Sequence, residues 1–369
     1  MKKKLVVIGA GEFQLPLILK AKELGFEVHA FAWADGAVAK DACDRFYPIS
    51  ITEYDAILEE CKKIQPSGIV TIGSDLASPT VCYLSEKLGL TSNPFETAKM
   101  CTNKYQMRRV FQAAGLPVPF FKLVAETDSL NPNQIPYPVI VKPTDRSGSR
   151  GIFLVERKEQ LMPALQVSIG HSFDKNAIIE GFIPGNEYSC ECISYHGQHH
   201  FLAITKKYTT GAPNYIETGH IQPCDISPEM QEKIKAHIFD ALTALGIQNG
   251  ASHTEFKVDH KGNFGIIEIG ARMGGDCIGS DLVYLSTGYD FLKMVIDVAC
   301  GIAPQVVPTG VAYKQARITF LFDEADIAKL EALKQSDPDS IYRISDIEME
   351  NLGKTTDSAS RLGYYITVK

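Results

Sequence analysis

Short apolar runs alternate with stretches of helical spacing over the first hundred residues. The runs predict buried strands, because parallel strands that are covered on both faces are almost continuously apolar. They are residues 4–9 (KLVVIG), 26–31 and 68–72, and the stretches of helical spacing are residues 15–24, 55–64 and 80–87. Since strands and helices alternate, we expect a doubly wound α/β domain with a parallel sheet over about residues 1–100.

The pattern changes beyond the turn at Asn93-Pro94. One helix is expected from about Pro94 to Ala114, and the polar segment 121–138, which has three prolines, is expected to be a loop. From Val139 onward, strands joined by glycine-containing turns predict antiparallel sheets mixed with helices. These helices are expected near residues 157–166 and 228–245, and a smaller segment after Gly301 carries expected strands at 316–322 and 364–368 and a helix near 326–333.

Composition and charge narrow the class of protein. The chain has 369 residues, of which 45% are hydrophobic, so it has enough apolar residues for a core and disorder is excluded as its main state. The net charge of −7 argues against a nucleic-acid partner. No apolar run approaches the length of a membrane span, and the nine cysteines are scattered. We therefore expect a cytoplasmic protein without disulfides that acts on small molecules.

The first strand leads into Gly9-Ala10-Gly11-Glu12-Phe13-Gln14. A glycine turn between a strand and a helix can hold a phosphate at the helix N-terminus. However, Gln14 replaces the third glycine of the dinucleotide-binding pattern. The segment therefore favours a simple tight turn over a dinucleotide site, and an NAD-dependent oxidoreductase remains an alternative hypothesis.

A stronger motif starts at Lys142, which ends an apolar strand and precedes the loop TDRSGSRG, residues 144–151. Glycines let the backbone approach a ligand, and serine hydroxyls and backbone N–H groups donate to phosphate oxygens. The loop is expected to bind phosphate beside Lys142, although a flexible surface hairpin remains an alternative. Its candidate ligands are Ser147, Gly148, Ser149 and Gly151.

An apolar strand leads from Ala177 through Glu180 into Phe182-Ile183-Pro184-Gly185, and Glu187 follows. A turn that joins two sheets exposes backbone groups, which can recognise the edge of an adenine ring. Glu187 could then accept hydrogen bonds from ribose hydroxyls. Taken alone, the segment is equally typical of a structural turn.

Two further strands are predicted on either side of the turn at residues 259–265, and each presents one carboxylate, Glu255 or Glu268. Two carboxylates that face each other repel unless a cation lies between them. Mg²⁺ prefers few carboxylates together with phosphate oxygens and water, so the pair predicts a divalent site beside a nucleotide. Arg272 and Gly274-Gly275 follow, and a guanidinium group there can hold a phosphoryl or carboxylate group. Outward-facing glutamates paired with Lys257 or Arg272 are the alternative.

The segment 206–220 is polar and contains cations and aromatic residues. It is expected to be a loop that could serve as a substrate lid, in which Glu217 and His220 could shape a pocket for an amine. A solvated loop is the alternative.

Taken in order, these motifs resemble the ATP-grasp superfamily over nearly the whole chain. The order is an α/β domain, a lysine on a helix, a lysine before a glycine/serine hairpin, the Glu180–Glu187 segment, and two glutamates followed by Arg-x-Gly-Gly. The closest resemblance is to the carboxylate–amine ligases, which include D-alanine–D-alanine ligase, biotin carboxylase, the glycinamide synthetases of the purine pathway and carbamoyl phosphate synthetase. The resemblance implies an N-terminal Rossmann-like domain over 1–100, a small nucleotide-binding subdomain over 101–185, a large subdomain with the metal site over 186–305, and a C-terminal α+β subdomain over 306–369.

The resemblance also implies a role for each matching residue. Lys104 and Lys142 would bind nucleotide phosphates with residues 147–151, and Glu180, Phe182, Ile183 and Glu187 would bind adenine and ribose. Glu255 and Glu268 would bind Mg²⁺ or Mn²⁺, Arg272 and Lys142 would be catalytic, and Glu217, His220, Arg272, Gly274, Gly275 and Asp276 are candidates for the substrate pocket. The chain departs from the family at Gly270, where asparagine is usual, and at Ala271, where proline is usual.

The implied reaction is the ATP-dependent coupling of a carboxylate to an amine. Attack of the carboxylate on the γ-phosphate gives an acyl phosphate, the amine displaces phosphate, and the products are ADP, phosphate and an amide. The implied cofactors are ATP and Mg²⁺, and the implied assembly is a homodimer without nucleic-acid or membrane partners. A nucleotide-binding regulator without turnover is the second alternative, although both lysines and both carboxylates are retained.

Overall fold

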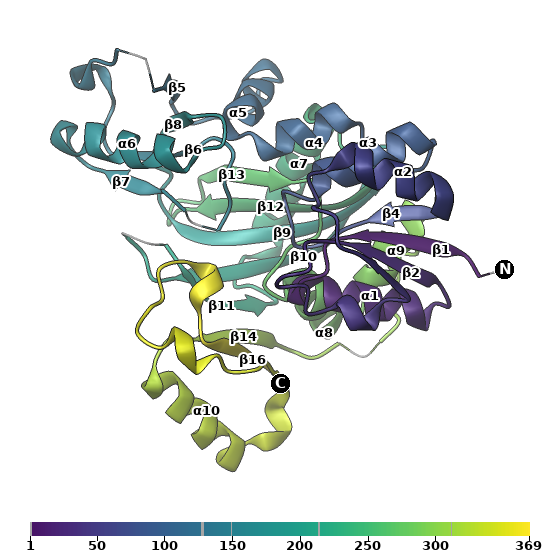
Figure 1. The fold of residues 1–369 in the computed structure, drawn as a ribbon. Helices are drawn as coiled ribbons and strands as arrows, with labels where there is room; N and C mark the ends of the chain where they lie inside the picture. The colour runs from purple at the N-terminus through teal and green to yellow at the C-terminus, as the bar shows by residue number, and fades with distance from the viewer. Residues whose placement is uncertain (1, 127–128, 149, 213–214, 311) are drawn as a thin grey trace.

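The structure, a computed structural model, describes residues 2–126, 129–148, 150–212, 215–310 and 312–369. Its strands form three sheets, and helices pack against them (Figure 1). The mixture of one parallel sheet and two antiparallel sheets confirms the predicted fold class.

The first sheet is parallel and has the strand order β3-β2-β1-β4. Alternate residues of β1 point to opposite faces, so Leu5 and Val7 pack against one layer of helices while Val6 and Ile8 pack against the other. This arrangement confirms the doubly wound domain. Its elements are β1 (Lys4–Ile8), α1 (Leu15–Glu23), β2 (Glu27–Phe31), β3 (Arg45–Tyr47), α2 (Tyr54–Ile64), β4 (Gly68–Val70) and α3 (Ser78–Leu88).

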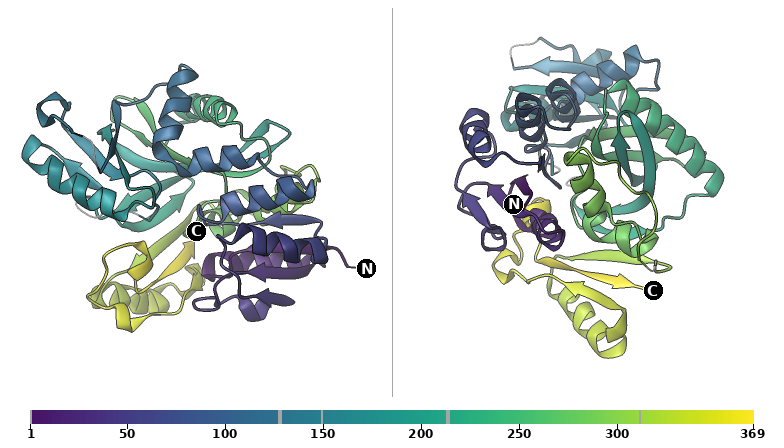
Figure 2. Two further views of the ribbon diagram at one scale, coloured as in Figure 1. Left: turned by 45° about the horizontal axis from the view of Figure 1, so that its top comes forward. Right: turned by 90° about the vertical axis from the view of Figure 1, so that its right-hand side faces the viewer.

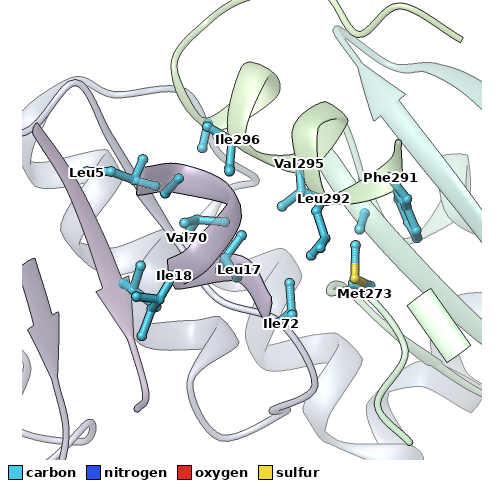
Figure 3. Close-up of a cluster of buried hydrophobic side chains, with 14 of the residues drawn as sticks. Leu5, Leu17, Ile18, Val70, Ile72, Met273, Phe291, Leu292, Val295 and Ile296 are labelled. Carbon is cyan, nitrogen blue, oxygen red and sulfur yellow. The ribbon is translucent and has the colours of Figure 1, made fainter. Parts of the chain in front are cut away.

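Helix α9 (Phe291–Ala299), from far along the chain, covers the same face of this sheet as α1. Figure 3 shows Leu292, Val295 and Ile296 of α9 pointing toward Leu17 and Val70 of the N-terminal domain. The N-terminal domain is therefore fastened to the rest of the chain by a continuous apolar core.

The second sheet is antiparallel, has the order β5-β8-β6-β7, and packs against helix α6. The polar segment 121–138 was expected to be a loop, but its first residues pair with β8 as β5, so that expectation was wrong there. The elements are β5 (Phe121–Ala125), β6 (Val139–Pro143), β7 (Phe153–Val155), α6 (Leu161–His171) and β8 (Asn176–Gly181).

The single helix expected over 94–114 is two helices, α4 (Phe95–Thr102) and α5 (Lys104–Ala113). Asn103 lies between them in an extended conformation, and its side chain accepts a hydrogen bond from the Gln106 N–H (3.1 Å). Asparagine favours this position because it satisfies a helix N–H that has no partner within the helix.

The third sheet has eight strands in the order β13-β12-β9-β10-β11-β14-β16-β15. Helix α7 covers one face at the β13 end, and the segment that contains α8 packs against β10. The strands and helices are β9 (Asn186–Tyr195), β10 (Gln198–Thr209), β11 (Glu217–Gln222), α7 (Pro228–Ala244), β12 (Gly250–Val258), β13 (Phe264–Gly270), α8 (Val283–Thr287), β14 (Ala316–Leu321), α10 (Glu324–Ser336), β15 (Ile341–Ile344) and β16 (Gly363–Val368).

Two features of this sheet differ from the sequence pattern. Segment 206–220 was expected to be a loop, but much of it belongs to the paired strands β10 and β11. Polar residues such as Lys207 and His220 are buried in these strands. The C-terminal strands β14, β16 and β15 extend the same sheet rather than forming one of their own. Tyr364 of β16 donates a hydrogen bond to Glu12 Oε1 (3.1 Å), so the C-terminal segment lies beside the N-terminal domain (Figure 2).

Short helical turns connect these elements. They are η1 (Glu12–Gln14), η2 (Lys40–Ala42), η3 (Pro132–Gln134), η4 (Lys158–Gln160), η5 (Ile278–Leu282), η6 (Pro338–Ser340), η7 (Met349–Asn351) and η8 (Ser358–Ser360). None of the helices among the described residues has the length and apolar character that crossing a membrane requires.

Candidate active site

Most of the predicted site residues lie where the second sheet (β5-β8-β6-β7, the small sheet) meets the eight-stranded sheet (the large sheet). Lys104, the first residue of α5, forms an ion pair with Glu268 of the large sheet (2.8 Å). Its Nζ also donates to the backbone oxygen of Arg146, in the loop of the small sheet (2.8 Å). One lysine therefore ties the predicted phosphate loop to a predicted metal ligand, and the break at Asn103 places it there.

A second cluster is buried in the small sheet. Lys142 Nζ lies 2.6 Å from Glu180 Oε2, and Arg108 Nε donates to Glu180 Oε1 at 2.6 Å. Burial would raise the pKa of Glu180, but Arg108 and Lys142 outweigh it and lower the pKa to about 2. Burial lowers the pKa of Lys142, although Glu180 opposes this effect. The Glu180 carboxylate is thus paired with two cations, Arg108 and Lys142.

Arg108 was not predicted from the sequence. Arg108 is 1% exposed, and its Nη2 donates to the backbone oxygen of Ile267 (2.7 Å) in β13. The only signal in the sequence was a basic residue on the buried face of a helix, next to Met107 and one turn before Phe111. Such a residue needs an acidic partner, but the sequence does not say which one.

The predicted phosphate loop connects β6 to β7. Ser147 and Gly148 are exposed, and Gly148 and Gly151 have positive φ angles (72° and 70°), which favour glycine. Ser149, also predicted to contact phosphate, lies outside the described residues. Arg150 reaches Asp357 of the C-terminal segment (3.6 Å).

The predicted adenine and ribose residues lie between β8 and β9. The Phe182 N–H donates to the backbone oxygen of Pro138 (3.2 Å), and the Ile183 side chain packs against Gly265. Glu187, in β9, lies opposite Lys207 and Lys257 in the neighbouring strands. Burial raises the pKa of Glu187, and Lys207 opposes this effect.

Glu255 and Glu268 are directly opposite each other on β12 and β13, so their side chains share one face of the sheet. Lys207 Nζ contacts Glu255 and lies 3.5 Å from Glu187 and 3.7 Å from Glu217. Burial would lower the pKa of Lys207, but these carboxylates raise it well above its usual value. Lys207 is therefore a cation among three carboxylates of this face, whereas Glu268 is paired with Lys104. The sequence analysis had assigned Lys207 to a loop.

The donor set fits a magnesium ion. No group of three or more histidine, cysteine or acidic side chains that could hold a metal is found in the part of the chain that the structure describes. Mg²⁺ usually keeps several waters and takes only one or two protein carboxylates beside nucleotide phosphates. Glu255 and Glu268, each of which is partly exposed, supply such a pair.

A buried histidine lies beside Glu255 on the same face of β12, and the sequence analysis gave it no role. His253 Nδ1 contacts Glu191, and its Nε2 lies 3.3 Å from Glu255 Oε1. Burial would lower the pKa of His253, but Glu191 and Glu255 raise it to about 9. Glu191 also accepts a hydrogen bond from the Gly274 N–H (3.0 Å), so one buried carboxylate orients both Glu255 and the glycine turn.

Arg272 forms a bidentate ion pair with Asp75 of the N-terminal domain. Its Nε donates to Asp75 Oδ1 and its Nη2 to Asp75 Oδ2, each at 2.8 Å. The pair explains the departure at Gly270. A Cβ atom at that position would lie 2.9 Å from Asp75 Oδ1 and 3.2 Å from the guanidinium carbon of Arg272. The ion pair therefore occupies the room that a side chain at position 270 would need.

The candidate substrate residues form a separate group at the C-terminal edge of this face. Asp276 accepts hydrogen bonds from Arg361 at 2.8 and 3.0 Å, and its Oδ2 lies 3.5 Å from His220 Nε2. Glu217 accepts a hydrogen bond from the Ser358 hydroxyl (2.5 Å). Asp276 lies within the turn from Gly275 to Ile278, where the Ile278 N–H donates to the backbone oxygen of Gly275 (2.9 Å), and Gly274 precedes this turn. The sequence did not indicate Arg361 or Ser358, because both lie about 80 or more residues away along the chain.

The N-terminal glycine turn is occupied by its own side chain. Gln14 Oε1 accepts a hydrogen bond from the Gly11 N–H (3.0 Å), and Gln14 Nε2 donates to the backbone oxygen of Ile72 (2.7 Å). Gln14 also lies 3.0 Å from the place where Gly9 would carry a Cβ atom. Because the turn's donor is satisfied internally, the geometry favours the tight-turn interpretation.

Comparison with known proteins identifies the same region. Residues 135–281 match the ATP-grasp domain family. The chain is 27% identical over 273 residues to alanine–anticapsin ligase of Bacillus subtilis (strain 168). The aligned region is 67% of this chain but only 57% of that relative's length.

Solved structures match over the whole chain. An L-amino acid ligase from Bacillus licheniformis has a TM-score of 0.80 at 25% identity, with 100% of this chain and 94% of that chain covered. A phosphoribosylglycinamide synthetase from Anaerococcus prevotii has a TM-score of 0.79 at 23% identity, with the same coverage. The second likeness bears on the fold alone.

Proposed function

Residues 135–281 are an ATP-grasp domain, and from this premise we propose that the chain is an ATP- and Mg²⁺-dependent ligase that couples a carboxylate to an amine. The observation that carries the proposal is the pair Glu255 and Glu268, which face each other beside Lys104 and Lys207. Two carboxylates next to cations suit a magnesium nucleotide whose γ-phosphate is transferred.

The proposal gives each group of residues a role. Lys104 and Lys142, with the loop at residues 144–151, would bind the phosphates of ATP, and the segment from Phe182 to Glu187 would bind adenine and ribose. Glu255 and Glu268 would hold Mg²⁺ (or Mn²⁺), which supplies charge neutralisation at the transferred phosphoryl group. Lys207, which lies among three carboxylates, is a further candidate to approach that group. Arg272 would position the substrate carboxylate after exchange of its contact with Asp75.

Amino acids are the substrate class that the comparisons support best. Two similar proteins, alanine–anticapsin ligase and L-amino acid ligase, are named as ligases of amino acids. The group formed by Glu217, His220 and Asp276 would then be the pocket for the amine or for a substrate side chain. We expect ADP, phosphate and an amide or peptide as products, a cytoplasmic setting and a homodimer.

The test is release of ADP and phosphate from Mg-ATP in the presence of pooled amino acids and small carboxylic acids. Lys142→Ala is the control. Pool-dependent ADP release that the control lacks would support the proposal. Release of AMP and pyrophosphate would contradict the acyl-phosphate route. Tight ATP binding without turnover in any pool would favour a nucleotide-binding regulator, and nicotinamide-nucleotide binding would revive the oxidoreductase hypothesis, which the occupied glycine turn disfavours.

A further inference from the structure

His220 is the most unusual side chain in the candidate substrate group. It is 0% exposed, yet neither ring nitrogen has a hydrogen-bond partner among the described residues. The nearest polar atom in an ion-pair contact is Asp276 Oδ2, at 3.5 Å. Buried polar groups are usually satisfied, so an unpartnered imidazole beside a carboxylate marks a place that a ligand can complete.

This place is continuous with the proposed metal site. His220 is the cross-strand partner of Lys207, whose Nζ contacts Glu255. Glu217 lies 3.7 Å from the same Nζ, and its other oxygen accepts the Ser358 hydroxyl. The proposed metal site is therefore linked through Lys207 to Glu217 and His220, and through His220 to Asp276.

Arg361 neutralises the charge of Asp276, the last residue of this series. Its guanidinium group donates to both oxygens of Asp276 and lies 3.6 Å above the ring of Phe320. Burial would raise the pKa of Asp276, but Arg361 lowers it well below its usual value, so the carboxylate is ionised. The two charges cancel, and the end of the group is neutral rather than anionic.

The backbone holds Asp276 in place for this contact. Asp276 and Cys277 have φ angles of 50° and 60°, a conformation that side-chain-bearing residues rarely adopt. Such conformations persist where surrounding contacts enforce them, and they are concentrated at functional sites. Asp276 also lies in the turn that begins at Gly275, and Glu191 holds the preceding residue through the Gly274 N–H.

We propose that the Asp276–Arg361 ion pair sets the charge specificity of the substrate pocket, so that it accepts neutral side chains and rejects cationic ones. This inference rests on the proposed amino-acid ligase function. Arg361 takes the position at Asp276 that a cationic side chain of a substrate would otherwise occupy. It acts as a positioning and specificity-determining residue, since it acts through Asp276 rather than on the reacting atoms.

The test compares leucine, lysine and glutamate as variable substrates in ADP-release assays with a fixed pool of small amino acids. Arg361→Met keeps the length of the side chain and its packing on Phe320 but leaves Asp276 unpaired. We expect the kcat/KM ratio of lysine to leucine to rise by about tenfold or more, mainly through KM for lysine. Arg361→Met/Asp276→Asn should return the ratio to the wild-type value. Asp276→Asn alone should shift preference toward glutamate, because Arg361 is then the unpaired charge.

The outcomes distinguish a failure of this inference from a failure of the proposed ligase function. Wild-type turnover with a ratio that Arg361→Met does not change would overturn the inference and leave the ligase proposal intact. A ratio that stays high in the double variant would also overturn it, as would a fall in stability without any change in preference. A wild type that releases no ADP with any pool would count against the ligase proposal. In that case calorimetric titration of lysine and leucine into wild type and Arg361→Met, with Mg-ADP present, still decides whether the ion pair controls the charge of the pocket.

Discussion

At the scale of single residues, Glu180 shows how this site keeps charge inside a sheet. Arg108 reaches it from helix α5 and Lys142 from strand β6, each at 2.6 Å. If a buried carboxylate has only one cationic partner, loss of that partner leaves an uncompensated buried charge and strongly destabilises the fold. With two cations on separate elements, Glu180 is ionised and also joins the helix to the sheet.

The low pKa of Glu180 predicts a specific dependence of stability on pH. A folded-state pKa of about 2, against an unfolded value of 4.5, stabilises the folded state above pH 4.5, and this contribution is lost as pH falls toward 2. The difference in unfolding free energy between wild type and Glu180→Gln should therefore shrink by about 2 kcal/mol between pH 5 and pH 3. Urea unfolding at a series of pH values measures it. A difference that stays constant or grows toward pH 3 would show that Glu180 is not held as a carboxylate.

Loss of Lys142 should affect the nucleotide more than the fold. In Lys142→Ala, Arg108 still holds Glu180, so the sheet keeps its buried ion pair. The affinity for Mg-ADP should fall by about tenfold or more, because a charged phosphate contact is removed. Calorimetry measures the affinity, with Lys158→Ala as the matched control, since Lys158 is an exposed lysine of the same region. Equal affinities in the two variants would contradict the assignment of the phosphate site.

At the scale of elements, the break between α4 and α5 decides where Lys104 points. The apolar spacing continues across Asn103, so the sequence predicted one helix where the structure has two. The chain bends because the Asn103 side chain caps α5 and the Lys104 N–H donates to the backbone oxygen of Thr144 (2.8 Å). That second contact is long-range, so local spacing could not reveal it.

Asn103→Ala should lower the unfolding free energy by about 1 kcal/mol through loss of the cap. It should also raise the KM for ATP, because Lys104 is the next residue. Asn103→Asp preserves a capping oxygen and should retain most of the stability. Denaturant unfolding and ATP titration of both variants provide the data. If alanine and aspartate behave alike, the cap does not position the lysine.

At the scale of the whole molecule, the N-terminal domain and helix α9 form one core, and this places Asp75 against Arg272. Gly68 lies at the closest approach, where a Cβ atom would meet the backbone oxygen of Ala299 at 2.7 Å. Neither backbone can move without disturbing the apolar residues drawn in Figure 3.

Gly68→Ala should therefore lower the unfolding free energy by about 1–3 kcal/mol, as overpacking does. Gly170→Ala is the matched control, since Gly170 lies in α6 with open space around it and an unremarkable φ angle. That variant should be neutral or up to about 1 kcal/mol more stable. Thermal and denaturant unfolding measure both. Similar values for the two variants would mean that the two regions are not packed tightly at Gly68.

The sequence predicted those features of the site that depend on neighbours in the chain. The hairpin that places Glu255 opposite Glu268 is local, and the structure confirms that pairing. By contrast, Arg108, Asp75, Glu191 and Arg361 act through partners 60 or more residues away, so their contacts depend on how sheets and domains pack. The strands at 198–209 and 217–222 escaped prediction because charged residues on their buried face mimic a polar loop.

The central claim is that a substrate carboxylate attacks the γ-phosphate of ATP at the Glu255–Glu268 pair. The most direct test uses pooled amino acids whose carboxyl oxygens carry ¹⁸O, with Mg-ATP, followed by mass analysis of the phosphate released. An acyl-phosphate route transfers one labelled oxygen from the carboxylate to phosphate, and this transfer should be abolished in Glu268→Gln. Unlabelled phosphate released with ADP would mean that water attacks ATP, and label in AMP would mean activation at the α-phosphate; either result would contradict the account.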